Sequence, residues 1–157
     1  MSAPTILERR VEATDPSATT ALGLALAKAA RPGDLICLWG ELGAGKTHLA
    51  KAFGAGLGVM ETITSPSFIL MAEYAGRLPL FHIDLYRLGD AADVVAGGLI
   101  DDRQTTGVTL VEWPDRMAGI LPVGRLDVFI DGAGDDPRTI TLRAGSPDLQ
   151  RYLDAVP

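Results

Sequence analysis

The segment Gly40–Thr47 contains residues whose types and spacing could do chemistry. It reads GELGAGKT and matches the pattern G-x-x-x-x-G-K-[ST], which is typical of loops that bind nucleotide phosphates. Its glycines allow backbone angles and close approaches that a side chain would block. Backbone N–H groups can then converge on phosphate oxygens at the start of a helix. We expect Lys46 to reach the β- and γ-phosphates and the hydroxyl of Thr47 to ligate Mg²⁺.

A glycine-rich turn could match this pattern by chance. The apolar run LICLW at residues 35–39 predicts a buried strand before the loop, and KTHLAKAFGAGLG predicts a helix after it. These flanking elements favour the phosphate-binding interpretation. His48 follows the loop, and we expect it to pack or to face solvent, because the first helical turn should direct it away from the phosphates.

A phosphate-binding loop that acts as an enzyme needs an acidic residue near the metal, usually at the end of a neighbouring apolar strand. Glu112 ends the run VTLVE and Asp84 ends the run LPLFHID. One carboxylate could hold Mg²⁺ while the other orients or activates water. The alternative for each is a solvated acid at a strand end. His82 lies on the same strand face as Asp84, and Arg87 follows closely.

The elements that position these residues can be read from periodicity and turn signals. Strands are predicted at residues 5–12, 35–39, 68–74, 78–86, 107–113, 125–132 and 137–144. Helices are predicted at residues 16–30, 46–58 and within 147–156, with short helical turns at 89–102. The strands at 68–74 and 78–86, and those at 125–132 and 137–144, should form hairpins. We predict a single domain, residues 1–157, with an α/β P-loop NTPase fold and a mostly parallel central sheet with antiparallel hairpin additions.

Composition limits the function classes. The chain has 157 residues, of which 47% are hydrophobic and 22% charged, and its net charge is −6. Its basic residues form no cluster larger than Arg9-Arg10, so direct, tight binding of nucleic acid is not expected. Cys37, the single cysteine, is predicted to be a buried core residue. Because the chain has no signal peptide or apolar membrane span, we expect a cytoplasmic location.

Several nucleotide-binding classes can be excluded or disfavoured. The chain contains no asparagine, so the guanine-reading motif N-K-x-D is impossible and adenine is favoured. The signature L-S-G-G-Q of transporter ATPases is absent. A small kinase would need an arginine-bearing lid, and Arg87, Arg103 and Arg116 are scattered. A P-loop kinase therefore remains only as an alternative.

Four motifs together resemble the bacterial TsaE family of small ATPases for threonylcarbamoyladenosine modification of tRNA. They are GELGAGKT, TSPSF, HIDLYRL and VEWPDR, in this order, and the similarity covers about residues 15–145. The resemblance implies a P-loop α/β fold that binds ATP or ADP with Mg²⁺. It also implies that Asp84 is essential for hydrolysis, that Thr47 and Glu112 serve the metal, and that the loop around Thr64, Ser65 and Ser67 is switch-like.

The resemblance further implies which residues contact the nucleotide. We expect contacts from the segment before the first helix, the phosphate loop and the last hairpin, through Thr14, Glu41, Leu42, Gly43, Ala44, Gly45, Lys46, Thr47 and Arg138. Trp113 directly follows Glu112 and is expected to line the site. The segment 89–102 is less acidic than is usual in the family, and the hairpin sequence AGDDPR has more acids than is typical.

The family resemblance also implies a role. ATPase activity alone should be weak and should serve a complex with two other subunits, TsaD and TsaB, which the ATP cycle resets between turnovers. Those partners would then hold the tRNA. The alternative is a nucleotide-gated interaction switch in which hydrolysis is incidental.

Overall fold

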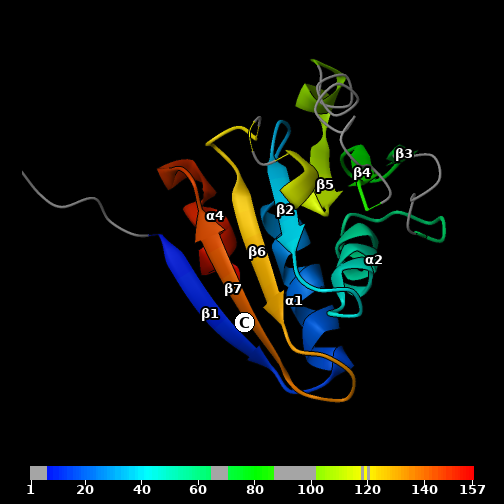
Figure 1. Cartoon of the computed structure of the whole chain (residues 1–157). Coiled ribbons are helices and arrows are strands. Elements are labelled where there is room, and N and C mark those ends of the chain that lie inside the picture. The colour runs from blue at the N-terminus through cyan, green and yellow to red at the C-terminus, as the bar shows by residue number, and fades with distance from the viewer. Residues whose placement is uncertain (1–6, 65–70, 87–101, 118, 120) are drawn as a thin grey trace, which may run out of the picture.

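The computed structural model describes residues 7–64, 71–86, 102–117, 119 and 121–157 (Figure 1). Within these residues seven strands form one sheet in the order β1-β7-β6-β2-β5-β4-β3. The strands are β1 (Glu8–Ala13), β2 (Leu35–Trp39), β3 (Met71–Tyr74), β4 (Leu80–Asp84), β5 (Val108–Glu112), β6 (Leu126–Asp131) and β7 (Arg138–Ala144). The helices are α1 (Pro16–Ala29), α2 (Lys46–Gly56) and α4 (Gln150–Asp154), with 3₁₀ turns η1 (Asp102–Thr106), η2 (Pro114–Met117) and η3 (Pro147–Leu149).

The centre of the sheet is parallel and its flanks are antiparallel. Strands β6, β2, β5 and β4 run parallel to one another, whereas β7 pairs antiparallel with both β6 and β1, and β3 pairs antiparallel with β4. This arrangement confirms the predicted α/β fold class with its hairpin additions. It also brings the carboxyl ends of β2, β5 and β4 to one edge of the sheet, where ligands bind in open α/β folds.

Side-chain alternation along the parallel strands divides the core between the two faces of the sheet. Ile36 and Leu38 of β2 belong to a core that includes apolar residues of α1, α2 and α4. Leu35 and Cys37 point to the opposite face and pack with Met117 of η2. Cys37 is fully buried, as predicted, and burial raises the pKa of its thiol to about 12. Figure 1 shows α1, α2 and α4 on the first face.

Helices α1 and α2 pack closely because two glycines lie at their contact. A Cβ atom on Gly23 would lie 2.6 Å from the Cβ of Ala52, and one on Gly56 would lie 2.5 Å from the Cβ of Ala27. Such distances are too short for real Cβ contacts. Gly56 is the last residue of α2, and its lack of a side chain lets α1 approach at this point.

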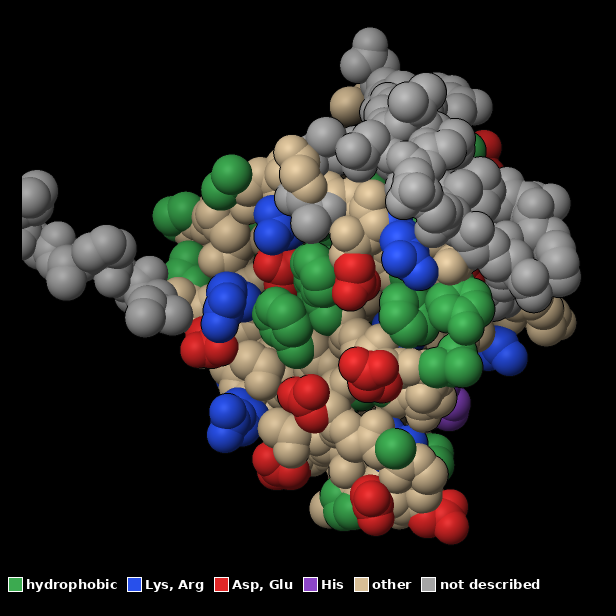
Figure 2. Space-filling model, in the orientation of Figure 1, with side chains coloured by type: hydrophobic (Ala, Val, Ile, Leu, Met, Phe, Trp, Pro, Cys, Tyr) green, Lys and Arg blue, Asp and Glu red, His purple; other side chains and the backbone are tan. Residues whose placement is uncertain are grey.

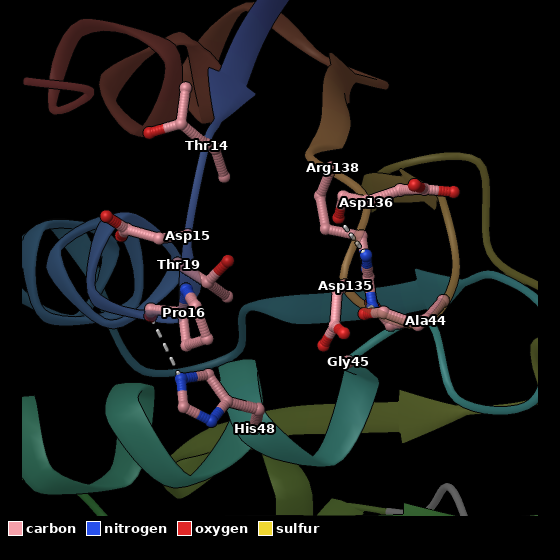
Figure 3. Close-up of a pocket in the computed structure, with 12 residues that line it drawn as sticks. Thr14, Asp15, Pro16, Thr19, Ala44, Gly45, His48, Asp135, Asp136 and Arg138 are labelled. Carbon is pink, nitrogen blue, oxygen red and sulfur yellow. Dashed lines mark hydrogen bonds between the residues drawn. The ribbon is translucent and has the colours of Figure 1, made fainter.

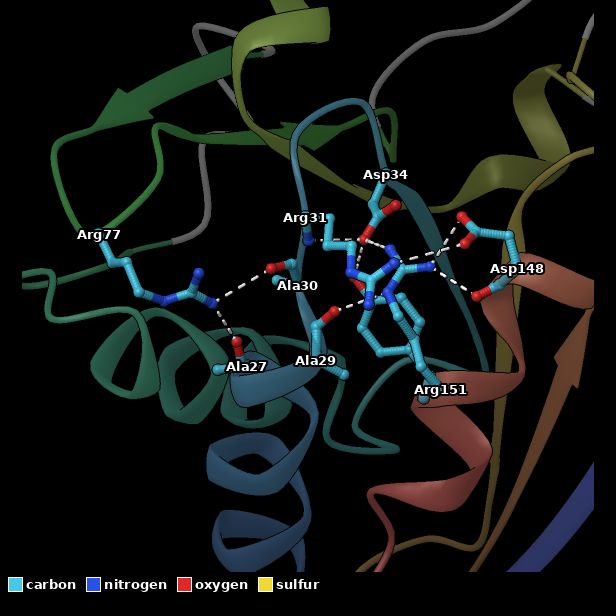
Figure 4. Close-up of polar contacts among 9 residues, drawn as sticks. Ala27, Ala29, Ala30, Arg31, Asp34, Arg77, Asp148 and Arg151 are labelled. Carbon is cyan, nitrogen blue, oxygen red and sulfur yellow. Dashed lines mark hydrogen bonds and ion pairs between the residues drawn. The ribbon is translucent and has the colours of Figure 1, made fainter.

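Polar contacts fix both ends of α1. At its start the carboxylate of Asp15 accepts hydrogen bonds from the Ser17 hydroxyl and the Ala18 N–H, which lower the pKa of Asp15. At its end the guanidinium groups of Arg77 and Arg151 donate to carbonyl oxygens of the last turn at 2.7 to 3.2 Å (Figure 4). These arginines satisfy carbonyls that the helix itself leaves without partners.

The sheet face opposite the helices carries an aromatic pair. The rings of Trp39 and Phe129 stack with centroids 5.8 Å apart, and Asp127 accepts hydrogen bonds from the Trp39 indole at 2.8 Å and from Arg125 at 2.9 Å. Acidic and basic side chains are interspersed over this side of the molecule (Figure 2). In the described part of the chain, no helix has the length and apolar character needed to cross a membrane.

The observed elements agree with the predicted ones to within a few residues where the structure describes them. Helix α4 and the two hairpins lie where the sequence indicates. The start of the strand predicted at 5–12, the first part of that at 68–74, and almost all of the segment 89–102 fall outside the described residues. The same holds for Ser65, Ser67 and Arg87.

Candidate functional site

The phosphate loop joins β2 to α2 and depends on its glycines. Gly43 and Gly45 have φ angles of 83° and 109°, which residues with side chains rarely adopt. At Gly40 a Cβ atom would lie 2.8 Å from the carbonyl oxygen of Ile130 in the neighbouring strand β6. The loop conformation therefore requires glycine at these three positions.

The ammonium group of Lys46 lies inside the loop. It donates to the carbonyl oxygens of Gly40 and Glu41, the latter at 3.2 Å, and lies 3.8 Å from the centre of the Trp113 ring. Only 5% of Lys46 is exposed. Burial lowers the pKa of Lys46, and the nearby carboxylate of Glu112 acts in the opposite direction. The buried ammonium is therefore held by carbonyl oxygens and an aromatic ring at the position where an anion would meet it.

Glu112 connects α2 to β4 through two hydrogen bonds. The Thr47 hydroxyl lies 2.9 Å from Oε1 of Glu112 and 3.2 Å from Oε2. Nε2 of His82 lies 2.6 Å from Oε2, and His82 is fully buried. Nδ1 of His82 has no hydrogen-bond partner among the described residues, so we assign the proton to Nε2, which donates to the carboxylate. Glu112 is thus fixed beside the hydroxyl of the phosphate loop.

Asp84 lies beside Glu112 at the ends of two parallel strands. The two residues are Cα partners in the β4–β5 ladder, and Asp84 is only 4% exposed. Oδ1 of Asp84 accepts the backbone N–H of Tyr86 at 2.9 Å. The two predicted acids are therefore adjacent, buried and held in different ways, Glu112 by a hydroxyl and an imidazole and Asp84 by its own following turn.

A cavity of about 420 Å³ collects these groups, and we call it the phosphate cavity. Eight of its ten lining residues are residues that the sequence analysis singled out as nucleotide, metal, catalytic or site-lining residues. The lining consists of Leu42, Gly43, Gly45, Lys46, Thr47, His48, Asp84, Tyr86, Glu112 and Trp113. One cation, one hydroxyl and two carboxylates thus converge on one space.

A second cavity, of about 310 Å³, lies on the other side of the loop, and we call it the base cavity (Figure 3). Three segments that are distant in sequence form it: the start of α1, the phosphate loop with α2, and the β6–β7 turn. Its lining is Ala13, Thr14, Asp15, Pro16, Thr19, Ala44, Gly45, His48, Gly134, Asp135, Asp136 and Arg138.

Arg138 attaches the β6–β7 turn to the phosphate loop. Its Nε donates to the carbonyl of Ala44 at 2.9 Å, and its NH2 group donates to Gly43 at 3.4 Å and to Gly134 at 2.9 Å. The guanidinium group therefore lies against the loop, where the sequence analysis expected a nucleotide contact, and it holds the turn that supplies one wall of the base cavity.

Glu41 and His48, both exposed, differ in their relation to the two cavities. Glu41 is exposed and lines neither cavity, although its carbonyl accepts from Lys46. His48 is exposed, as expected from its place on the helix, and it also lines both cavities. The prediction treated the helix alone, whereas the neighbouring start of α1 and the β6–β7 turn build the cavity around this position.

Several lining residues were not predicted as site residues, among them Tyr86, Asp135 and Asp136. The only signal for the two aspartates was the excess of acids in the hairpin sequence AGDDPR. Tyr86 could have been found from its place two residues after Asp84, at the end of a strand that faces the site. Its ring lies 4.9 Å from that of Trp113, so the two aromatic residues form one wall of the phosphate cavity.

The donor set in the phosphate cavity consists of hard oxygen ligands. Among the described residues no group of three or more His, Cys, Asp and Glu side chains is arranged to hold a metal ion by itself. Mg²⁺ in nucleotide sites needs only one or two protein oxygens, because phosphate oxygens and water complete its coordination. The Thr47 hydroxyl and the adjacent Glu112 carboxylate, 2.9 Å apart, fit that requirement.

Comparisons with known proteins identify the family of this chain. A family model described as "Threonylcarbamoyl adenosine biosynthesis protein TsaE" matches residues 13–140. The chain is 43% identical over 131 residues to a tRNA threonylcarbamoyladenosine biosynthesis protein TsaE of Bacillus subtilis, covering 83% of this chain and 82% of that protein. A protein of the same name from Treponema pallidum is 38% identical over 124 residues, with coverage of 79% and 92%.

A solved structure extends the similarity to three dimensions. The crystal structure of YdiB from Bacillus subtilis superimposes with a TM-score of 0.80 and 33% sequence identity, covering 98% of this chain and 97% of that one. The matched family model spans the phosphate loop, both strand-end acids and Arg138. On this evidence the chain belongs to the TsaE family of threonylcarbamoyladenosine biosynthesis proteins.

Proposed function

We propose that this protein is a Mg²⁺-dependent ATPase subunit of the machinery that places threonylcarbamoyladenosine in tRNA. The observation that carries the proposal is the convergence of Lys46, Thr47, Glu112 and Asp84 on the phosphate cavity. A structural ion pair would need two of these groups, whereas phosphoryl chemistry uses all four: a cation, a metal-ligating hydroxyl and two carboxylates.

The arrangement of the cavities supports a nucleotide as the ligand. The base cavity and the phosphate cavity lie against the same loop and share lining residues, so one molecule with an adenosine end and a triphosphate end can occupy both. Thr14 and Arg138 would flank the adenosine end. Backbone N–H groups of the loop from Leu42 to Thr47, with the ammonium of Lys46, would bind the phosphates.

The two acids suit different tasks. Glu112 is hydrogen-bonded to the Thr47 hydroxyl, so these two residues would hold Mg²⁺, which supplies charge neutralisation at the phosphate oxygens. The other carboxylate, Asp84, accepts the Tyr86 N–H and lies beside Glu112 at the end of the neighbouring strand. Asp84 would orient the attacking water and accept its proton. The contact of Glu112 with the Thr47 hydroxyl supports this division.

The family membership supports the biological assignment. We propose that hydrolysis by the isolated chain is slow, well below about 1 per second, and that TsaD-like and TsaB-like subunits stimulate it. ATP hydrolysis would then reset the complex, and the partners would hold the tRNA. We place this activity in the cytoplasm, which the single buried cysteine without a disulfide partner supports.

Isothermal titration and turnover assays test the proposal. Wild-type protein should bind ATP in the presence of Mg²⁺, and Lys46→Ala should lose most of that affinity. Asp84→Asn should bind ATP almost as the wild type does, but should abolish hydrolysis in the presence of both partner subunits. Asp154→Asn, which changes an exposed aspartate on α4, is the matched control. Unchanged ATP binding by Lys46→Ala would refute the assignment of the phosphate loop.

The same variant separates hydrolysis from gating. If nucleotide binding alone controls assembly, cells that carry Asp84→Asn should still modify their tRNA. If hydrolysis resets the complex, modification should stop although the variant protein still associates with its partners. Rapid ATP turnover by the isolated chain would instead favour an independent ATPase or a kinase.

A further inference from the structure

The base cavity and the phosphate cavity meet at one point of the site. Among the described residues, only Gly45 and His48 line both of them. Gly45 has no side chain, so in the described structure the imidazole of His48 is the single side chain at this junction. A ligand that occupies both cavities must pass beside it.

His48 also connects the two helices that form the junction. Its Nε2 lies 2.9 Å from the Thr20 hydroxyl oxygen and 3.2 Å from the Pro16 carbonyl oxygen, both in the first turns of α1 (Figure 3 draws the second contact). The Thr20 hydroxyl itself donates to the Pro16 carbonyl at 3.1 Å. A carbonyl oxygen only accepts, so Nε2 must carry a proton and donate. His48 on α2 therefore donates to Thr20 and Pro16 in the first turns of α1, and we call these two contacts the clamp.

This clamp acts where the close packing of the helices ends. Further along, Gly23 of α1 and Gly56 of α2 let the two helices approach closely. At the start of α1, Pro16 and Thr19 line the base cavity, and His48 bonds to that same turn. The separation between the first turn of α1 and the phosphate loop thus depends on the hydrogen bonds of His48. On the opposite side of the base cavity, the position of the β6–β7 turn depends in the same way on the hydrogen bonds of Arg138.

We infer that His48 is a positioning residue for the nucleoside part of the ligand. By holding the first turn of α1 against α2, it sets the width of the base cavity relative to the phosphate loop. The inference rests on the proposed function and goes beyond it, because it assigns His48 to binding of the adenosine end and not to binding of the phosphates. It predicts that loss of the clamp weakens the binding of ligands that span both cavities. The binding of ligands that occupy the phosphate cavity alone should not change.

Titration calorimetry with two ligands tests this assignment. The full chain is titrated with ATP and, separately, with inorganic tripolyphosphate, each with Mg²⁺. His48→Ala removes the clamp, and His48→Gln keeps an amide donor near the position of Nε2. Thr20→Val removes the hydroxyl partner without changing a residue that lines either cavity. Lys51→Ala, an exposed change one turn further along α2, is the matched control.

His48→Ala should raise the dissociation constant for ATP about threefold to tenfold, the effect of one hydrogen bond. Thr20→Val should shift it in the same direction by at least about twofold. The constant for tripolyphosphate should stay unchanged in both variants, and His48→Gln should bind ATP nearly as the wild type does. The inference would be overturned if the dissociation constants for ATP and tripolyphosphate rose equally, or if Thr20→Val left ATP binding unaffected.

The design separates this inference from the proposed function. A wild-type chain that binds neither ligand would overturn the proposed function and, with it, the role of His48. A wild-type chain that binds ATP, with Lys46→Ala unable to do so and His48→Ala unaffected, would overturn only the clamp. Thermal unfolding of each variant checks that His48→Ala, a change at an exposed position, leaves the fold intact.

Discussion

Replacing His82 with alanine should destabilise the protein strongly, because His82 is the buried partner of the carboxylate that faces the phosphate loop. The imidazole Nε2 lies 2.6 Å from Glu112, and His82 is 0% exposed. Losing a hydrogen bond to a charged group costs about 1.5–3 kcal/mol. The cavity left by the ring adds roughly 2 kcal/mol. Together these give a loss of about 3–5 kcal/mol, a large part of the roughly 5–15 kcal/mol that stabilises a typical domain.

Urea unfolding, followed by circular dichroism, measures this loss directly. In thermal unfolding a chain of this size should lose roughly 6–20 °C in melting temperature. His82→Gln should be less destabilised than His82→Ala, since an amide N–H can still donate to the carboxylate and fills part of the space. A loss below about 1 kcal/mol for His82→Ala would refute the reasoning.

A double-mutant cycle isolates the hydrogen bond from the cavity. Glu112→Ala removes the carboxylate that accepts from His82, so the combined variant, His82→Ala with Glu112→Ala, should be less destabilised than the sum of the two changes. The expected coupling is about 1.5–3 kcal/mol. Additive effects would mean that the two side chains do not stabilise one another, whatever their separation in the structure.

Three further changes test other parts of the site. Burial lowers the pKa of Lys46, so the unfolded chain binds more protons between the folded and unfolded pKa values, and stability should rise with pH in that window. Lys46→Met should lack this rise in a urea series and should fail to bind ATP in calorimetry. Arg138→Ala should weaken ATP binding about tenfold by releasing one wall of the base cavity, whereas Arg143→Ala, an exposed change on the same strand, should leave the titration unaffected. Gly23→Ala gains about 1 kcal/mol of helix propensity but places a Cβ 2.6 Å from Ala52, and overpacking of about 1–3 kcal/mol should make the net urea stability lower.

The sequence predicts the fold well because its strongest signals are local. The glycine pattern of the phosphate loop, the apolar runs of β2 and β5 and the turn residues between β6 and β7 each determine their own segment. The order of strands at the sheet edge does not depend on local signals, since β1 pairs with β7 through contacts between residues more than a hundred positions apart. No periodicity within either segment specifies that partner, so the sequence supports an edge strand without identifying its neighbour.

Residue spacing predicts the phosphate cavity but not the base cavity, of which only the family resemblance indicated Thr14 and Arg138. Lys46 and Thr47 lie in one motif, and the strand-end position of Asp84 and Glu112 brings both acids to the same sheet edge. The base cavity is assembled from three distant segments that share no spacing rule. His48 illustrates the consequence, because its helical position suggests an orientation toward solvent, while its role in the site depends on α1.

The contact between His82 and Glu112 lies between these two cases. Period-two alternation places His82 and Asp84 on one face of β4, and the register pairs His82 with Leu110 and Asp84 with Glu112. His82 therefore reaches Glu112 along the diagonal between strands, a separation that long side chains can bridge. The alternation can be read from the sequence, but the diagonal depends on the register, which only the structure supplies.

Trp113 connects the end of β5 to the loop lysine and to Tyr86. Its φ of 60° is an outlier for a bulky side chain and costs on the order of 1–3 kcal/mol. That backbone conformation accompanies a ring position 3.8 Å from the ammonium of Lys46 and 4.9 Å from the ring of Tyr86. A cation–π contact of a desolvated ammonium and an aromatic pair contribute amounts of the same order, about 0.5–2 kcal/mol each. The strain at the end of β5 is thus offset by contacts across the phosphate cavity, which ties the end of this strand to the loop that it faces.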